Sequence, residues 1–139
     1  MSDAKTLGRV IRQKWITAAD LMQNQNRAYV FGDNMARDGV GGQAGAMRGF
    51  ANAIGVPTKW LPRTGEKAYF KPADLHNPFV RAAILGAFHQ MSVLLSRGID
   101  VVIPTDGIGT GLSQLPQRAP EIHAWIEWLI ADLEGKTDG

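Results

Sequence analysis

Two glycine-rich segments contain the residues whose types and spacing are best suited to chemistry. The first, residues 32–44, follows the apolar run 28–31, and the second, residues 105–112, follows the run 100–104. A glycine-rich backbone turns tightly and lets its N–H groups approach a ligand closely. Where such loops leave strands and lead into helices, these donors and the helix dipole converge on an anion. The two loops predict a cleft for a phosphorylated ligand, with a nucleotide as the first candidate.

The first loop has more glycines than a structural turn requires. A Gly-Asp-Asn sequence after a strand is a common turn, because Asp and Asn tolerate a left-handed backbone. Gly39, Gly41 and Gly42 add an open row of amides just before a predicted helix. From that helix Gln43 and Arg48 could reach a ligand, although such residues are more often solvated.

In the second loop Gly107, Gly109 and Gly111 alternate with larger residues, a spacing that suits a backbone nest around a pyrophosphate. The spacing is not that of the Rossmann fingerprint, and no Gly-Lys-Ser/Thr sequence ends the loop as in a Walker A motif. A tight strand-to-helix turn without a ligand remains the alternative.

Strand-like and helix-like segments alternate along the chain. Strands are predicted at 9–15, 28–31, 54–59 and 101–103, and helices at 17–24, 43–52, 78–97 and 118–133. Within 60–77 only residues 68–70 resemble a strand, which leaves a lid or an extra strand pair open, and residues 135–139 are expected to fray. The alternation predicts an α/β fold with a mostly parallel or mixed sheet.

Composition predicts one domain over residues 1–139. The chain is 45% hydrophobic, has a net charge of +2 and contains no cysteine. The absence of cysteine excludes a disulfide scaffold and a thiolate nucleophile, and the small charge does not favour nucleic acid. No apolar run approaches the length of a membrane span, so a cytoplasmic protein without membrane contact is expected. His76, His89 and His123 are too scattered for a metal site, and no cofactor is predicted.

Both loops resemble those of macro domains, which bind ADP-ribose. Residues 34–47 are similar in order and spacing to the Asn-led loop of that family, and residues 105–112 resemble its phosphate loop. Pro57-Thr58-Lys59 resembles the Thr-Lys strand of the branch that removes ADP-ribose from acidic side chains or DNA bases. The chain also resembles small phage-associated proteins that have Phe-Gly-Asp-Asn and Ile-Pro-Thr-Lys segments. The resemblance covers residues 28–133 and implies a three-layer α/β/α macro-like domain with a mixed, mostly parallel sheet.

The resemblance implies a role for individual residues. Lys59 is similar in placement to the branch's catalytic lysine, which attacks a sugar carbon and needs a lowered pKa to do so. Without the resemblance, a solvated lysine at a strand end is an equal alternative. Asp33 and Asn34 would contact the distal ribose or the leaving group, while Gln43 and Thr58 lie beside the implied ligand. The remaining implied ligand-binding residues are Gly39, Gly41 and Gly42 at the distal ribose, and Gly107, Ile108, Gly109, Thr110 and Gly111 at the pyrophosphate.

One departure from the family pattern concerns proton transfer. The branch usually has an acidic residue directly after its phosphate loop, where this chain has Ser113. Serine does not act as a general acid or base at neutral pH without help, so Asp106 or Asp33 would have to replace it. Ser113 favours a non-catalytic nucleotide binder over a hydrolase, and Lys59 favours the hydrolase. A purely structural protein is the third possibility.

The expected ligand is therefore ADP-ribose or a related nucleotide, carried in the hydrolase case on an ADP-ribosylated protein or nucleic acid. Trp60 and Tyr69 are the candidates for stacking on adenine, because they lie close to Lys59 in sequence, and a surface role is an equal alternative.

Overall fold

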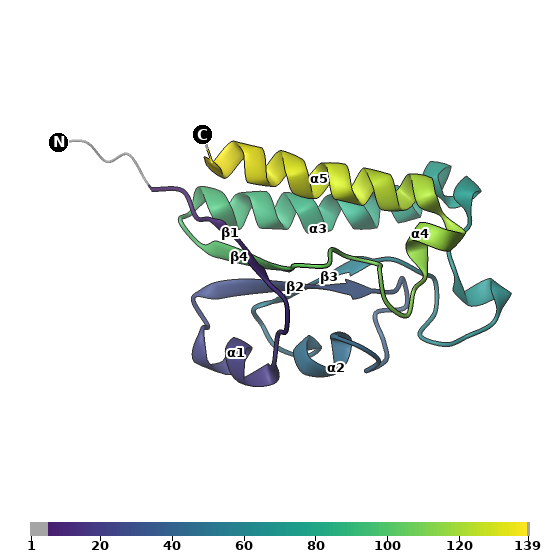
Figure 1. Ribbon diagram of the computed structural model, residues 1–139, viewed down its shortest axis with the longest axis horizontal. Helices are drawn as coiled ribbons and strands as arrows, with labels where there is room; N and C mark the ends of the chain where they lie inside the picture. The colour runs from purple at the N-terminus through teal and green to yellow at the C-terminus, as the bar shows by residue number, and fades with distance from the viewer. Residues whose placement is uncertain (1–5, 139) are drawn as a thin grey trace.

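Four parallel strands form the centre of the computed structural model, which describes residues 6–138 (Figure 1). They are β1 (Val10–Gln13), β2 (Arg27–Asp33), β3 (Ala53–Pro57) and β4 (Asp100–Pro104), in the order β1-β4-β2-β3. Each pair of neighbours is parallel. The predicted α/β fold is confirmed, whereas a mixed sheet is wrong for the described strands. After each strand the chain crosses back over a face of the sheet and begins the next strand at the edge where the previous one began. This crossover makes neighbouring strands parallel.

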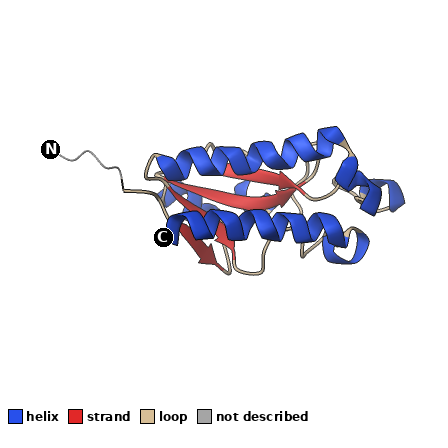
Figure 2. Ribbon diagram, turned by 90° about the horizontal axis from the view of Figure 1, so that it is seen from above, coloured by secondary structure: helices blue, strands red, loops and turns tan. Residues whose placement is uncertain are grey.

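Helices lie on both faces of this sheet. Figure 1 shows α3 (Pro78–Ser96) and α5 (Pro120–Asp138) on one face and α1 (Ala18–Gln23) and α2 (Ala44–Met47) on the other. Figure 2 shows that α3 and α5 run side by side above the strands. The short α4 (Leu115–Arg118) precedes α5.

Strand β2 is apolar on both sides because it supplies two cores. Ala28 and Val30 pack into the cluster beneath α3 and α5. Tyr29 and Phe31 point to the opposite face and pack with Met47 of α2. Successive strand residues face opposite ways, so a central strand covered by helices on both faces has no polar alternation.

Helix α3 has the length and composition of a membrane-spanning segment. By that criterion the expectation that no apolar run approaches this length is wrong. In the structure α3 is a core helix, with Val80, Ile84, Phe88 and Met91 buried.

Several predicted boundaries differ from those observed. The helix expected over 43–52 ends at Met47, because Arg48 is extended and Gly49 has a φ of 94°. The C-terminal helix is divided into α4 and α5, and α5 continues to Asp138 where fraying was expected; Gly139 lies outside the described residues. The extra strand pair considered for residues 60–77 is not formed. This segment contains the 3₁₀ turns Glu66–Ala68 and Pro72–His76 and one antiparallel bridge between Lys59 and Tyr69.

The start of α3 depends on Asn77, as the sequence predicts. Its Oδ1 accepts hydrogen bonds from the backbone N–H groups of Phe79 (2.9 Å) and Val80 (3.2 Å). Asn77→Ala should lower the free energy of unfolding by about 1 kcal/mol, since two N–H groups lose their acceptor. Urea denaturation monitored by circular dichroism measures the loss. Asn77→Asp keeps the acceptor and should stay near wild type; an equal loss in both variants would contradict the capping role.

Candidate functional site

A cleft of about 850 Å³ lies at the carboxyl edge of the sheet. The loop after β2 leads to α2 on one face, and the loop after the neighbouring β4 leads to α4 and α5 on the other (Figure 1). Where adjacent parallel strands send their connections to opposite faces, a crevice opens beyond the strand ends, and α/β proteins bind ligands there.

Every predicted site residue lines this one cleft. The three candidates for catalysis, Asp33, Lys59 and Asp106, lie on three different strand ends. Residues 14–17 after β1 also line the cleft, so all four strands contribute to it. The predicted ligand-binding residues in its wall are Asn34, Gly39, Gly41, Gly42, Gln43, Thr58, Gly107, Ile108, Gly109, Thr110 and Gly111.

The second loop requires glycine at position 109. Gly109 has a φ of +88°, which L side chains rarely adopt, and a Cβ there would lie 2.8 Å from Leu115 Cδ2 and 3.3 Å from Thr58 Cγ2. The Thr58 hydroxyl donates to the carbonyl of Asp33 (3.0 Å). The ends of β2, β3 and β4 are therefore packed against one another at the floor of the cleft.

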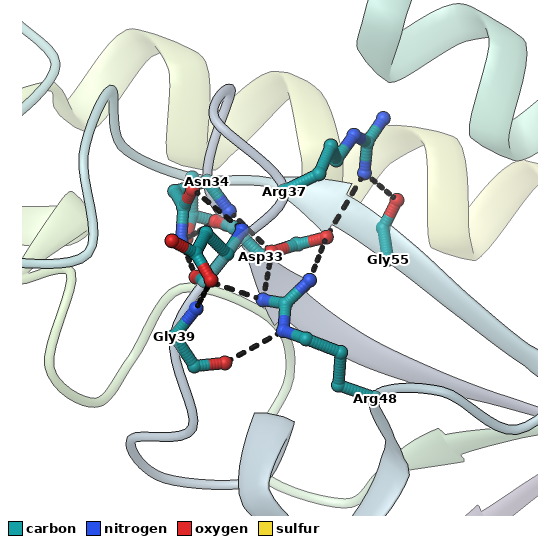
Figure 3. A network of polar contacts seen from close by, with 8 residues as sticks. Asp33, Asn34, Arg37, Gly39, Arg48 and Gly55 are labelled. Carbon is teal, nitrogen blue, oxygen red and sulfur yellow. Dashed lines mark hydrogen bonds and ion pairs between the residues drawn. The ribbon is translucent and has the colours of Figure 1, made fainter.

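The first loop is held by the buried carboxylate of Asp33 (Figure 3), whose side chain is only 3% exposed. Arg48 donates to Oδ1 (2.5 Å) and Arg37 to Oδ2 (3.2 Å). The same guanidinium groups also donate to backbone carbonyls, Arg48 to Gly39 (2.6 Å) and Arg37 to Gly55 (2.7 Å). Gly55 has to be glycine, since a Cβ would overlap the Asp33 carboxylate. Both carboxylate oxygens are occupied, which favours a positioning role for Asp33 over proton transfer.

Asn34 is also buried and fixes the beginning of the same loop. Its Nδ2 donates to the Asp38 carbonyl (2.7 Å), and the backbone N–H of Met35 donates to the Lys59 carbonyl (2.9 Å). This second contact connects the loop to the strand end that carries Lys59. Of the two amide hydrogens of Asn34, one is used by the loop, so the other can serve a ligand.

Lys59 is half-buried beside aromatic and cationic groups. Its Nζ donates to the carbonyl of Arg63 (3.0 Å) and lies 4.8 Å from the centre of the Tyr69 ring. The Arg118 guanidinium lies over the same ring at 3.7 Å. Burial lowers the pKa of Lys59 below its ordinary value, and the positive charge of Arg118 lowers it further. This is the direction of shift that a nucleophilic amine needs.

Of the two candidates for replacing the missing acid, Asp33 is paired with Arg37 and Arg48, and Asp106 is available. Asp106 is exposed in the cleft wall and forms no hydrogen bond with another residue in the described part of the chain. Ser113, at the position of the family's acid, is buried and donates to the Gly109 carbonyl (2.9 Å). Ser113 therefore supports the glycine loop, and Asp106 is the carboxylate free to meet a ligand.

The aromatic residues predicted to stack on adenine, Tyr69 and Trp60, contact other protein groups instead. Tyr69 is only 5% exposed and lies against Lys59 and Arg118. The Trp60 indole packs edge-on against Phe70 and donates to Asp74 (3.1 Å), and Trp60 does not line the cleft. The prediction is wrong because the Tyr69 ring is covered by Lys59 and Arg118, and the Trp60 ring packs against Phe70 away from the cleft.

Two contributions were missed from sequence. The residues after β1, including Trp15, reach the cleft, but only strand order shows that β1 lies next to β4. Arg48, expected to meet solvent or a ligand, is the main partner of Asp33. No sequence signal connects residues 33 and 48, because the ion pair depends on where α2 ends.

Comparison with known proteins gives one match. The model of a family described as "Family of unknown function (DUF7831)" matches residues 11–129. No curated protein and no solved structure matches the chain. The matched range includes every residue that lines the cleft, and of the four strands it leaves out only the first residue of β1.

The Asp33 network predicts unequal effects for its members. Asp33→Asn should lower the free energy of unfolding by about 3 kcal/mol, because two guanidinium groups lose a buried partner. Arg37→Met should cost under about 1 kcal/mol, since the Arg37 side chain is 45% exposed. Urea denaturation of both variants measures the difference. Equal small losses would show that the ion pairs do not hold the loop.

Proposed function

The chain belongs to the DUF7831 family, and we propose that it binds ADP-ribose or a related nucleotide in the cleft between its two glycine-rich loops. The observation that carries the proposal is the convergence of both loops on one cleft at the point where the connections of β2 and β4 diverge. Backbone amides of the second loop, at residues 107–111, would bind the pyrophosphate. A volume of about 850 Å³ is within the range of small-molecule sites.

The resemblance to macro domains supports the choice of nucleotide. The helices on both faces of a parallel sheet agree with the three-layer macro-like arrangement that the resemblance implies. The Asn34 loop, the phosphate-loop segment and the strand end with Thr58 and Lys59 meet in the cleft, as that resemblance requires. A cytoplasmic location and a phage association stay predictions.

We further propose that the chain hydrolyses an ADP-ribosyl linkage on a protein or nucleic acid. The neutral amine of Lys59 would attack C1 of the distal ribose, and the bond from C1 to the acceptor would break with its electron pair going to the acceptor. The amine gives up a proton, and the acceptor gains one. Water then hydrolyses the new C1–N bond, releasing ADP-ribose and free Lys59. Asp106 is the proposed proton carrier, and Asp33 positions the loop.

The second candidate is a binder without catalysis, which sequesters or senses an ADP-ribose-type nucleotide. The buried Ser113 hydroxyl, bonded to the Gly109 carbonyl, favours it, because the position of the family's acid is occupied by a loop-supporting residue. Both candidates use the same cleft, and turnover separates them.

Binding is tested by calorimetric titration with ADP-ribose on wild type and Gly111→Glu. Position 111 suits the test, because a Cβ there meets open space and the loop can stay folded. A carboxylate beside the pyrophosphate should raise Kd more than about tenfold through like-charge repulsion. Gly111→Gln has the same size without the charge and should stay within about threefold of wild type. Absence of ADP-ribose binding to wild type would refute the proposed function.

Catalysis by Lys59 predicts a specific pH dependence. The reacting form is the neutral amine, so the rate should rise with pH through the lowered pKa of Lys59. Arg118→Gln removes a positive charge that disfavours protonated Lys59; the pKa then rises and the profile moves to higher pH. Initial rates of ADP-ribose release between pH 6 and 10 measure the shift.

Matched variants complete this test. Lys59→Ala should abolish turnover while ADP-ribose still binds. Glu66→Gln removes the ion-pair partner of Arg118 but leaves the positive charge of Arg118 in place, so the pH profile should be unchanged. Turnover by Lys59→Ala would exclude a nucleophilic role. Binding without turnover in wild type would establish the second candidate.

A further inference from the structure

Trp15 is the one aromatic residue among the described residues that line the cleft. It follows the end of β1, lines the cleft together with Lys14, Ile16 and Thr17, and is 76% exposed. An indole so open to water carries a large apolar surface that folding leaves uncovered. Its place in the cleft wall leaves this ring accessible to a ligand bound in the cleft.

The backbone that carries Trp15 is fixed by hydrogen bonds. Gln13 Nε2 donates to the Trp15 carbonyl (2.8 Å) and to Asp20 Oδ2 (2.9 Å). Thr17 donates to the same carboxylate oxygen through its backbone N–H (2.8 Å) and its hydroxyl (3.1 Å). These bonds hold the pKa of Asp20 below its ordinary value, with the Thr17 backbone N–H as the largest cause. The indole is thus presented from a preorganised turn.

Strand order gives the position of Trp15 relative to the rest of the cleft. Because β1 and β3 are the two edges of the sheet, Trp15 and Lys59 lie at opposite ends of the row of strand ends, with both glycine loops between them. Three strand spacings separate the edges by about 14 Å. A nucleotide with its pyrophosphate on the second loop would extend its base in one direction and its distal sugar in the other.

We propose that Trp15 stacks on the purine base of the nucleotide and selects it by ring area rather than by the hydrogen bonds of its edge. The proposal rests on the proposed function, since it assigns the base end of the same ligand. Purines cover more of an indole than pyrimidines do, and stacking does not distinguish adenine from guanine.

The polar groups around Trp15 support a base that stacks on the indole without specific hydrogen bonds to the edge of the base. Gln13 and Thr17 both donate to the Asp20 carboxylate. Gln43 donates to the Ile16 carbonyl (3.1 Å), and its unpartnered Oε1 is buried and out of reach of a base. Lys14 offers only N–H donors, which N7 of either purine accepts.

The experiment measures Kd for ADP-ribose, ADP, GDP, UDP and pyrophosphate on wild type, Trp15→Ala and Trp15→Phe. Trp128→Ala is the matched control, because Trp128 is also exposed (61%) but lies on α5 and does not line the cleft. Trp15→Ala should weaken ADP and GDP roughly tenfold and leave pyrophosphate unchanged. Trp15→Phe should retain most of the affinity, Trp128→Ala all of it, and wild type should bind ADP and GDP within about threefold of each other and more tightly than UDP.

Fluorescence gives a readout that a structural role would not change. ADP should quench tryptophan emission in wild type and in Trp128→Ala but not in Trp15→Phe. If wild type binds ADP-ribose but Trp15→Ala leaves ADP affinity unchanged, or if ADP and GDP differ more than tenfold, this proposal alone is wrong. If wild type binds none of the ligands, the proposed function fails, and the role of Trp15 fails with it.

Discussion

Parallel pairing of the four strands is the constraint on which the cleft depends. Parallel strands all end at the same edge of a sheet. The segments after β1, β2, β3 and β4 are therefore neighbours, although Gln13 and Pro104, which end β1 and β4, are far apart in the chain. The connections of β2 and β4 then leave for opposite faces, which separates the two glycine loops and leaves space between them. An antiparallel strand in this sheet would have moved one loop to the opposite edge.

Within that frame, a buried charge keeps the first loop in place. Taking the Asp33 carboxylate out of water is costly, and the cost is offset because Arg37 and Arg48 supply charged donors to both oxygens. The arginines also bond backbone carbonyls on β3 and in the loop, so one ion-pair network connects β2, β3 and the segment after α2 (Figure 3). Asp33, which resembles a catalytic acid in sequence, therefore positions Asn34 and the loop that follows it.

Much of the fold could be predicted from local physical signals. The Asn77 cap with Pro78 marks the beginning of α3, the Thr17–Asp20 capping box marks α1, and the apolar runs mark the strands. The glycine segments indicated both walls of the cleft, because glycine-rich turns after strands are themselves a local pattern. The signals failed where two elements compete for the same residues. Met47 ends α2, and the next residue, Arg48, turns to Asp33. Residues 60–77 have one isolated bridge, between Lys59 and Tyr69, and a hydrogen bond from Trp60 to Asp74 in place of a strand pair.

The sequence by itself determined which segments become strands, which helix ends are capped, and that two glycine loops follow strands, since each of these depends on neighbours within a few residues. Only the tertiary structure decided that the sheet is parallel, that Trp15 shares a cleft with Lys59, and that Arg118 lies near enough to lower the pKa of that lysine. The tertiary structure also decided that the Tyr69 ring is buried and that both oxygens of the Asp33 carboxylate are paired with arginines. These properties come from contacts between residues far apart in the chain, whose strength depends on distance and burial, and neither quantity is encoded in local spacing.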